Sequence, residues 1–222
     1  MGYIRKAVAG FSWQTVLKII SSLVTLGKIS ILARILTPAD FGLFSLSLIA
    51  LGLSESTTQT GVNVTIMQSK RSMSYFLDTA WVIAITRGFI IAILMNLLGY
   101  GLSHYFAQPE LLFLVALTSF IPVIKGFINP AIVLFRKNLQ FFKGSLFSLL
   151  IRVAEAIITV GLAYWLKSVE ALILGMIGAA LVEVVVSLLY FELKPRFRYF
   201  KSRAQEILKA AKWLSLSSLI GY

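Results

Sequence analysis

Several stretches of this sequence are apolar and long enough to cross a lipid bilayer, yet they contain charged side chains. The basic ones are Lys18, Lys28, Arg87, Lys125 and Arg152, and the acidic ones are Glu55, Glu155 and Glu183. A charge in hydrocarbon is costly, so such residues normally face a protein interior or a watery cavity, where they mark a pathway for a substrate or an ion. The excess of five basic over three acidic groups argues against a cationic substrate.

Helical spacing places these charges on faces that they share with other polar side chains. In the segment 145–166, one stripe recurs at steps of three or four residues and comprises Ser145, Ser148, Arg152, Glu155 and Thr159. Arg152 and Glu155 lie one turn apart and could pair along the helix. Smaller polar clusters surround Lys18, Glu55 and Lys125 in three other segments. The stripes predict a polar cavity shared between the helices.

We therefore expect Lys18, Arg87, Lys125 and Arg152 to bind the substrate in this cavity. Glu55 and Glu155 are expected either to hold these cations in ion pairs or to respond to a coupling ion or proton. A structural ion pair that locks two helices together is the alternative reading for the deeply placed charges.

Three residues have a simpler interpretation. Lys28 lies near the end of its segment and can extend its ammonium group to the membrane surface, so we consider it the least important of the cations. Arg87 lies about 10 Å from the end of its segment, at 1.5 Å per residue. Its guanidinium group could therefore reach the membrane surface only with the side chain fully extended. Glu183 follows the small residues Gly175 and Gly178, which favour close helix packing.

Six apolar segments must carry these residues, at about 11–34, 41–66, 80–102, 110–135, 145–166 and 170–191. The chain is 58% hydrophobic and only 14% charged, whereas soluble domains are about 25% charged. Because backbone groups in lipid must bond within their own segment, the sequence predicts an all-α integral membrane protein with six complete transmembrane helices.

Asp40 can cap the start of the second helix. Pro122, Gly126 and Pro130 predict a kinked or broken fourth helix.

Basic residues alternate between the two ends of these segments. Fourteen flank the spans on one side, against only Arg34 and Lys167 on the other. The positive-inside rule then places the N-terminus and the stretch 192–212 in the cytoplasm. We expect residues 1–191 to form a six-helix bundle, 192–212 to connect this bundle to a second one, and 213–222 to begin a seventh transmembrane helix. The chain is then expected to be about half of a larger transporter.

The basic connector 192–212 is expected to lie against anionic lipid headgroups. Its apolar side chains, which we expect at the membrane interface, are Phe197, Tyr199, Phe200, Ile207 and Leu208. Although the net charge of the whole chain is +12, nucleic acid is not the expected partner. Most of the positive charge follows the membrane topology, and no soluble domain is available to present a basic patch.

Enzymatic chemistry finds little support in the sequence. Cysteine is absent and His104 is the single histidine, so neither a thiolate site nor a multi-histidine metal site can form. There is no phosphate-binding loop and no nucleophile elbow. We expect no cofactor and no catalytic residue. An enzyme acting on membrane lipid carriers remains an alternative, but it would need a base or a metal site.

The run from Leu32 to Phe44, LARILTPADFGLF, resembles the first-loop signature of bacterial polysaccharide exporters. Gly61 and the triplet Ile66-Met67-Gln68 also resemble the pattern of this family at the end of the second helix. These are the Wzx-type flippases of the multidrug/oligosaccharidyl-lipid/polysaccharide exporter superfamily. The resemblance implies twelve or more helices in two bundles, so this chain is expected to be an N-terminal half.

The resemblance also implies a function in polysaccharide or O-antigen biosynthesis. The expected activity is transport of an oligosaccharide on a polyprenyl-diphosphate carrier across the bacterial cytoplasmic membrane, with a polymerase and glycosyltransferases as further partners. Arginine and lysine suit a diphosphate crossing the membrane, and alternating access of two bundles would expose the cavity to each side in turn. The alternative is a cation-coupled multidrug or small-molecule antiporter of the same fold.

Overall fold

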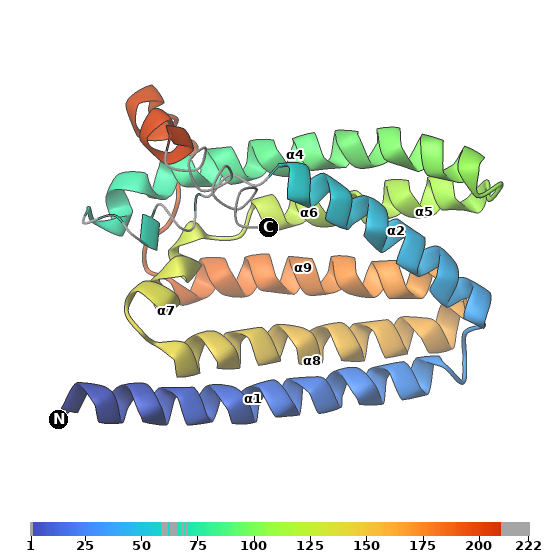
Figure 1. The fold of residues 1–222 in the computed structure, drawn as a ribbon, viewed down its shortest axis with the longest axis horizontal. Coiled ribbons are helices and arrows are strands. Elements are labelled where there is room, and N and C mark those ends of the chain that lie inside the picture. Colours follow the sequence, from blue (N-terminus) through green and yellow to red (C-terminus); the bar gives the residue numbers. More distant parts are fainter. Residues whose placement is uncertain (1, 59–61, 63–65, 68, 70, 210–222) are drawn as a thin grey trace, which may run out of the picture.

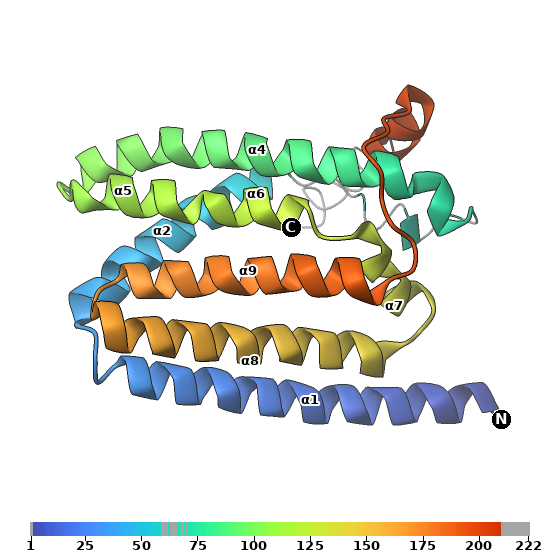
Figure 2. The same ribbon diagram turned by 180° about the vertical axis from the view of Figure 1, so that it is seen from behind.

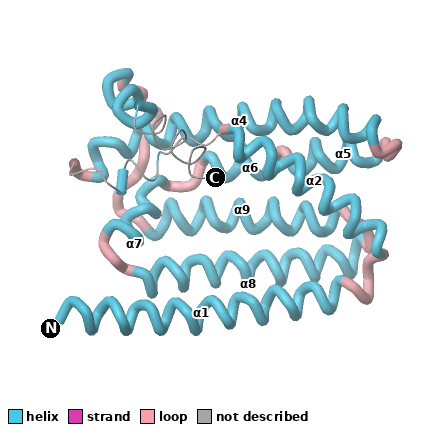
Figure 3. Tube along the Cα trace, viewed as in Figure 1, coloured by secondary structure: helices cyan, strands magenta, loops and turns pink. Residues whose placement is uncertain are grey.

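The computed structural model describes residues 2–58, 62, 66, 67, 69 and 71–209. In this part of the chain all regular secondary structure is helical, with no strand (Figure 3). The elements are α1 (Gly2–Leu32), α2 (Pro38–Thr57), α4 (Met73–Tyr105), α5 (Glu110–Thr118), α6 (Phe120–Gly126), η1 (Pro130–Val133), α7 (Leu134–Lys137), α8 (Phe141–Leu166) and α9 (Glu170–Tyr190). Residues 201–209 are also helical. The predicted start of a seventh transmembrane helix, 213–222, lies outside the described residues.

Five of these helices are long and apolar enough to cross a membrane: α1 from Trp13, α2, α4, α8 and α9. A sixth span is broken, because Glu110–Gly126 and Pro130–Lys137 meet at an angle of 75°. Only 11% of the apolar window of α1, and at most 33% of any other window, is buried within the bundle. Such large apolar surfaces are stable in lipid and not in water. The chain is a multi-pass membrane protein, as the sequence predicts.

The helices form two neighbouring rows (Figures 1 and 2). In one row α1, α8 and α9 lie side by side, and in the other α4 lies along α5 and α6, while α2 crosses obliquely between them. The start of α4, α7 and the stretch 191–209 lie together at one end of the bundle, which we call the basic end. At this end Phe76, Ile66 and Ile207 are fully buried in one apolar cluster.

Local signals in the sequence explain where two of the spans begin and bend. The Oγ1 atom of Thr37 accepts a hydrogen bond from the backbone N–H of Asp40, whose carboxylate accepts one from the N–H of Thr37. This reciprocal capping box, with Pro38 in the first turn, starts α2. The break after Gly126 is stabilised by the buried Asn129, whose side chain accepts from the N–H of Ala131 and donates to the carbonyl of Leu193. The predicted break in the fourth span is confirmed.

Two boundaries differ from the sequence prediction. α2 begins at Pro38 and ends at Thr57, well short of residue 66, and α4 begins at Met73, before residue 80. At the end of α2 the guanidinium group of Arg87 on α4 donates to the backbone carbonyls of Glu55 and Thr58. Carbonyls at a helix end have no partner within the helix, and a cationic side chain can satisfy them.

The contact between α8 and α9 depends on a glycine. A Cβ atom added to Gly175 would lie 2.0 Å from Oγ1 and 2.8 Å from Cα of Thr159. Gly178, on the next turn, is also confined, because Ile158 lies 3.1 Å from the position of its missing Cβ. The two helix backbones therefore approach one another as closely as small residues allow.

We expect Gly175→Ala to lower the free energy of unfolding by roughly 2–3 kcal/mol, because the added methyl group forces α8 and α9 apart. Thermal unfolding in detergent measures the effect. Gly161→Ala is the matched control, since nothing lies within 4 Å of the missing Cβ of this glycine on α8. Equal unfolding temperatures for the two variants would contradict the assignment of Gly175 as a packing contact.

Candidate functional site

A cavity of about 400 Å³ lies at the basic end between α1, α8 and the η1–α7 segment. Three cations line it: Lys18 from α1, Arg152 from α8 and Arg136 from α7. Hydroxyl groups of Ser21, Ser145 and Ser148 are also in the lining, and no acidic side chain is among the described residues that form the wall. Guanidinium and ammonium groups with adjacent hydroxyls are the donors that proteins use for phosphate oxygens.

The cavity arises because two polar stripes face each other. Lys18 and Ser21 lie one turn apart on α1, and Ser145, Ser148 and Arg152 lie on successive turns of α8, which packs beside α1. Both stripes are visible in the sequence, where helical spacing puts each set on one face. The structure thus brings Lys18 and Arg152, two of the four predicted cations, into one cavity.

The remainder of the predicted α8 stripe points elsewhere. Glu155 pairs with Lys28 of α1, with 2.6 Å between its Oε1 atom and Nζ of the lysine. The two side chains are only 24% and 18% exposed. Thr159 is buried against Gly175 of α9. The carboxylate of Glu155 is therefore engaged across two helices, and the predicted pairing with Arg152 along α8 does not form.

Lys28, the least important cation by sequence reasoning, has a specific partner instead of extending to the membrane surface. The one feature of the sequence that points to this partner is the position of Lys28 at the edge of the α1 stripe. In the structure Glu155 lies beside it, at the same level along the neighbouring parallel helix α8. Spacing along one helix does not identify a partner on another, so the pair could not be assigned in advance. The ion pair fixes the register of α1 against α8, just beyond the cavity.

Arg87 lies outside the cavity. Its Nε atom donates to the carbonyl oxygen of Thr58 at 2.7 Å, and one terminal nitrogen donates to that of Glu55 at 3.2 Å. Both acceptors are backbone groups at the end of α2, so the arginine caps that helix. Glu55 contributes its carbonyl, and its carboxylate forms no ion pair with Arg87. These two predicted site residues join α2 to α4.

Lys125 is exposed at the end of α6, immediately before the break in the fourth span. It attracts Glu183 of α9 electrostatically, without a direct ion pair between them in the described part of the chain. Lys125 does not line the cavity. The structure consequently separates the four predicted cations into a pair in the cavity and two residues at other places.

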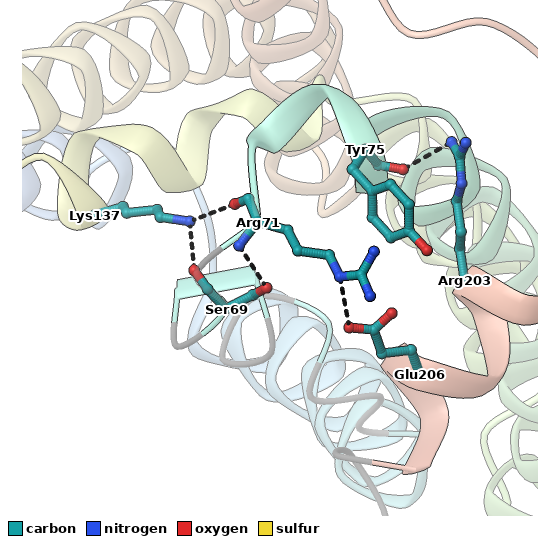
Figure 4. Close-up of polar contacts among 6 residues, drawn as sticks. All are labelled: Ser69, Arg71, Tyr75, Lys137, Arg203 and Glu206. Carbon is teal, nitrogen blue, oxygen red and sulfur yellow. Dashed lines mark hydrogen bonds and ion pairs between the residues drawn. The ribbon is translucent and has the colours of Figure 1, made fainter.

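Arg136 is not among the predicted site residues, because its position just after a span indicates only membrane orientation. The break in the fourth span changes this, since it turns η1 and α7 back across the cavity. The adjacent Lys137 holds α7 in place by donating from Nζ to the carbonyl oxygens of Ile66, Ser69 and Arg71, at 3.1, 2.9 and 3.2 Å. Figure 4 shows two of these contacts. One residue of α7 therefore anchors the segment, and its neighbour faces the cavity.

Comparison with known proteins agrees with this architecture. A family profile described as "Polysaccharide biosynthesis protein" matches residues 31–222. Among curated proteins, the chain is similar to the lipopolysaccharide biosynthesis protein WzxC of Escherichia coli (strain K12), with 22% identity over 221 residues. The match covers 98% of this chain but 44% of WzxC, so the chain spans less than half the length of that relative. No solved structure matches.

Proposed function

This chain belongs to the polysaccharide biosynthesis protein family, and on that basis we propose that it forms one bundle of a transporter for a polyprenyl-diphosphate-linked oligosaccharide. The observation that carries the proposal is the cavity at the basic end, with Lys18, Arg136 and Arg152 in its wall and no acidic residue among the described residues that line it. A diphosphate brings several negative charges into the membrane, and paired arginines offer it bidentate hydrogen bonds. The proposed activity is transport, without a chemical step.

The charge distribution of the bundle supports a direction of transport. By the positive-inside rule the basic end would face the cytoplasm, so the cavity would open toward the leaflet in which the lipid-linked precursor is presented. The sugar would occupy the aqueous opening, and the polyprenyl chain would remain in lipid beside the outer face of α1, on which Ile19, Leu23 and Leu26 are more than half exposed.

Transport then requires the cavity to open alternately to each side. The proposal assigns this movement to rocking of the present bundle against a second one, in a protein of the length of WzxC. Residues of α1 and α8 supply two of the cations in the cavity wall. Farther along the same two helices, the ion pair of Lys28 with Glu155 holds α1 against α8. Export would deliver the oligosaccharide to the outer leaflet for polysaccharide or lipopolysaccharide assembly.

Deletion of the gene in its own host tests the proposal. The expected result is loss of a surface polysaccharide, together with accumulation of polyprenyl-diphosphate-linked oligosaccharide that is accessible only from the cytoplasmic side. The full-length gene on a plasmid should reverse both effects. A deletion strain with normal surface polysaccharide and increased sensitivity to cationic drugs would contradict the proposal and would indicate the antiporter function.

A further inference from the structure

The segment after α9 carries a run of basic and aromatic residues, Arg196-Phe197-Arg198-Tyr199-Phe200-Lys201, which we call the connector run. Every residue of the run is exposed, and Phe197 and Tyr199 remain 70% and 57% exposed. The run holds three positive charges and no acidic residue. We propose that the connector run is a preformed binding surface for the headgroups of anionic phospholipids.

The run is held in a fixed conformation on α4. The backbone N–H of Arg196 donates to Oδ1 of Asp78 at 2.9 Å, and that of Phe200 donates to Oγ1 of Thr79 at 3.4 Å. The ring of Phe197 lies on the buried Trp81, with 4.5 Å between ring centroids. Figure 2 shows the connector crossing α4 in front, on its way from the end of α9 to the helix 201–209. The side chains that point away from α4 are thus presented without the entropy cost of ordering a loose loop.

The helix after the run anchors it from the other side. Ile207 is fully buried in the apolar cluster at the basic end, so it does not rest at the membrane interface as the sequence predicts. Arg203 donates to the carbonyl of Tyr75 at 2.8 Å, and its guanidinium group lies 4.5 Å from the centre of the Tyr75 ring, on which Arg71 also lies (Figure 4). Ala204 and Ile207 of this helix are used for packing, whereas Leu208 remains 46% exposed. Lipid binding therefore falls to the connector run.

The level of the run along α4 matches the headgroup region. α4 has 33 residues, which corresponds to about 50 Å of helix, whereas the hydrocarbon core of a bilayer is about 30 Å thick. Its ends must extend into the headgroup layers, and the run contacts it at Asp78, Thr79 and Trp81, within the first three turns. Aromatic rings between basic residues are typical of protein surfaces at this depth.

Neighbouring acidic groups form no ion pair with the run in the described part of the chain. Asp78 accepts a hydrogen bond from the backbone N–H of Arg196, and Glu206 pairs with Arg71 at 3.6 Å. Among the described residues, none of Asp78, Glu192 and Glu206 forms an ion pair with Arg198 or Lys201. The charges of Arg198 and Lys201 are therefore available to lipid phosphates. Each basic residue at a membrane surface strengthens binding of anionic lipid about fivefold, so these two together contribute about 25-fold.

The experiment compares two charge-matched double variants of the purified protein in a neutral detergent. Phosphatidylglycerol is titrated in, with phosphatidylcholine as the neutral lipid, and the rise in unfolding temperature reports binding to the folded state. For Arg198→Gln with Lys201→Gln, we expect the midpoint of the phosphatidylglycerol titration to shift to about 25-fold higher concentration. Arg34→Gln with Lys167→Gln removes two exposed charges from the opposite end and should leave the midpoint unchanged.

Two outcomes would overturn the proposal. The first is an unchanged midpoint in the Arg198 and Lys201 variant, whether or not its unfolding temperature in neutral lipid is lower. The second is an equal shift of the midpoint in the control. If the double variant is poorly expressed, Arg198→Gln alone should shift the midpoint about fivefold.

Discussion

Replacing Lys18 and Arg152 together by glutamine is expected to lower the transport rate of a diphosphate-linked substrate by about a hundredfold or more. Both side chains line the same cavity at the basic end, and each hydrogen bond to a charged group contributes about 1.5–3 kcal/mol. Two such losses correspond to at least two factors of ten in rate. The initial rate of lipid-linked oligosaccharide flipping by the full-length protein in proteoliposomes measures the effect.

Lys143→Gln provides the control for this experiment. Lys143 is exposed near the start of α8, more than two turns before Arg152, and it is not part of the cavity wall. The control should transport at close to the normal rate.

Arg136→Gln should reduce transport by about tenfold or more, because the same charge–phosphate interaction is removed. Normal transport by the Lys18 and Arg152 double variant at normal expression would exclude the cavity as the diphosphate site.

The cavity shows which parts of a membrane protein can be predicted from one sequence. Apolar segments of bilayer length and the break in the fourth span depend on local composition and local backbone chemistry, and both are confirmed by the structure. At the start of the second span Asp40 takes part in the capping box, but the capping residue is Thr37 and the helix begins at Pro38. The two polar stripes that contain Lys18 and Arg152 also follow from spacing, because a helix puts residues three or four apart on one face.

The partners of the other charges could not be predicted. They depend on how each helix is rotated about its own axis and how far it is shifted along the bundle relative to its neighbours. Lys125 is as deep in its predicted segment as Arg152, yet it lies at a helix break outside the cavity, and Arg87 caps α2. Arg136 enters the wall only because the chain bends by 75° before it. A periodicity argument gives the face of a residue but not the helix that the face meets.

Breaking the ion pair of Lys28 with Glu155 is expected to destabilise the bundle more than any other single change in α1. Lys28→Met leaves the carboxylate of Glu155, which is 24% exposed, without its partner at 2.6 Å. An unpaired buried charge typically costs about 3–5 kcal/mol, so we expect a loss near the lower limit for this partly exposed pair. Unfolding in a denaturing detergent, followed by circular dichroism, measures the loss.

The double variant Lys28→Met with Glu155→Leu decides between structural and coupling roles for this pair. Replacing both charges by apolar groups removes the unpaired carboxylate, so the free energy of unfolding should return to within about 1 kcal/mol of the unmodified protein. A purely additive loss would contradict the direct pairing. Since the cavity cations stay in place, the double variant should also retain transport within a few fold. A stable double variant that no longer transports would instead assign Glu155 to ion or proton coupling, because a carboxylate that only holds α1 against α8 can be replaced by an apolar contact.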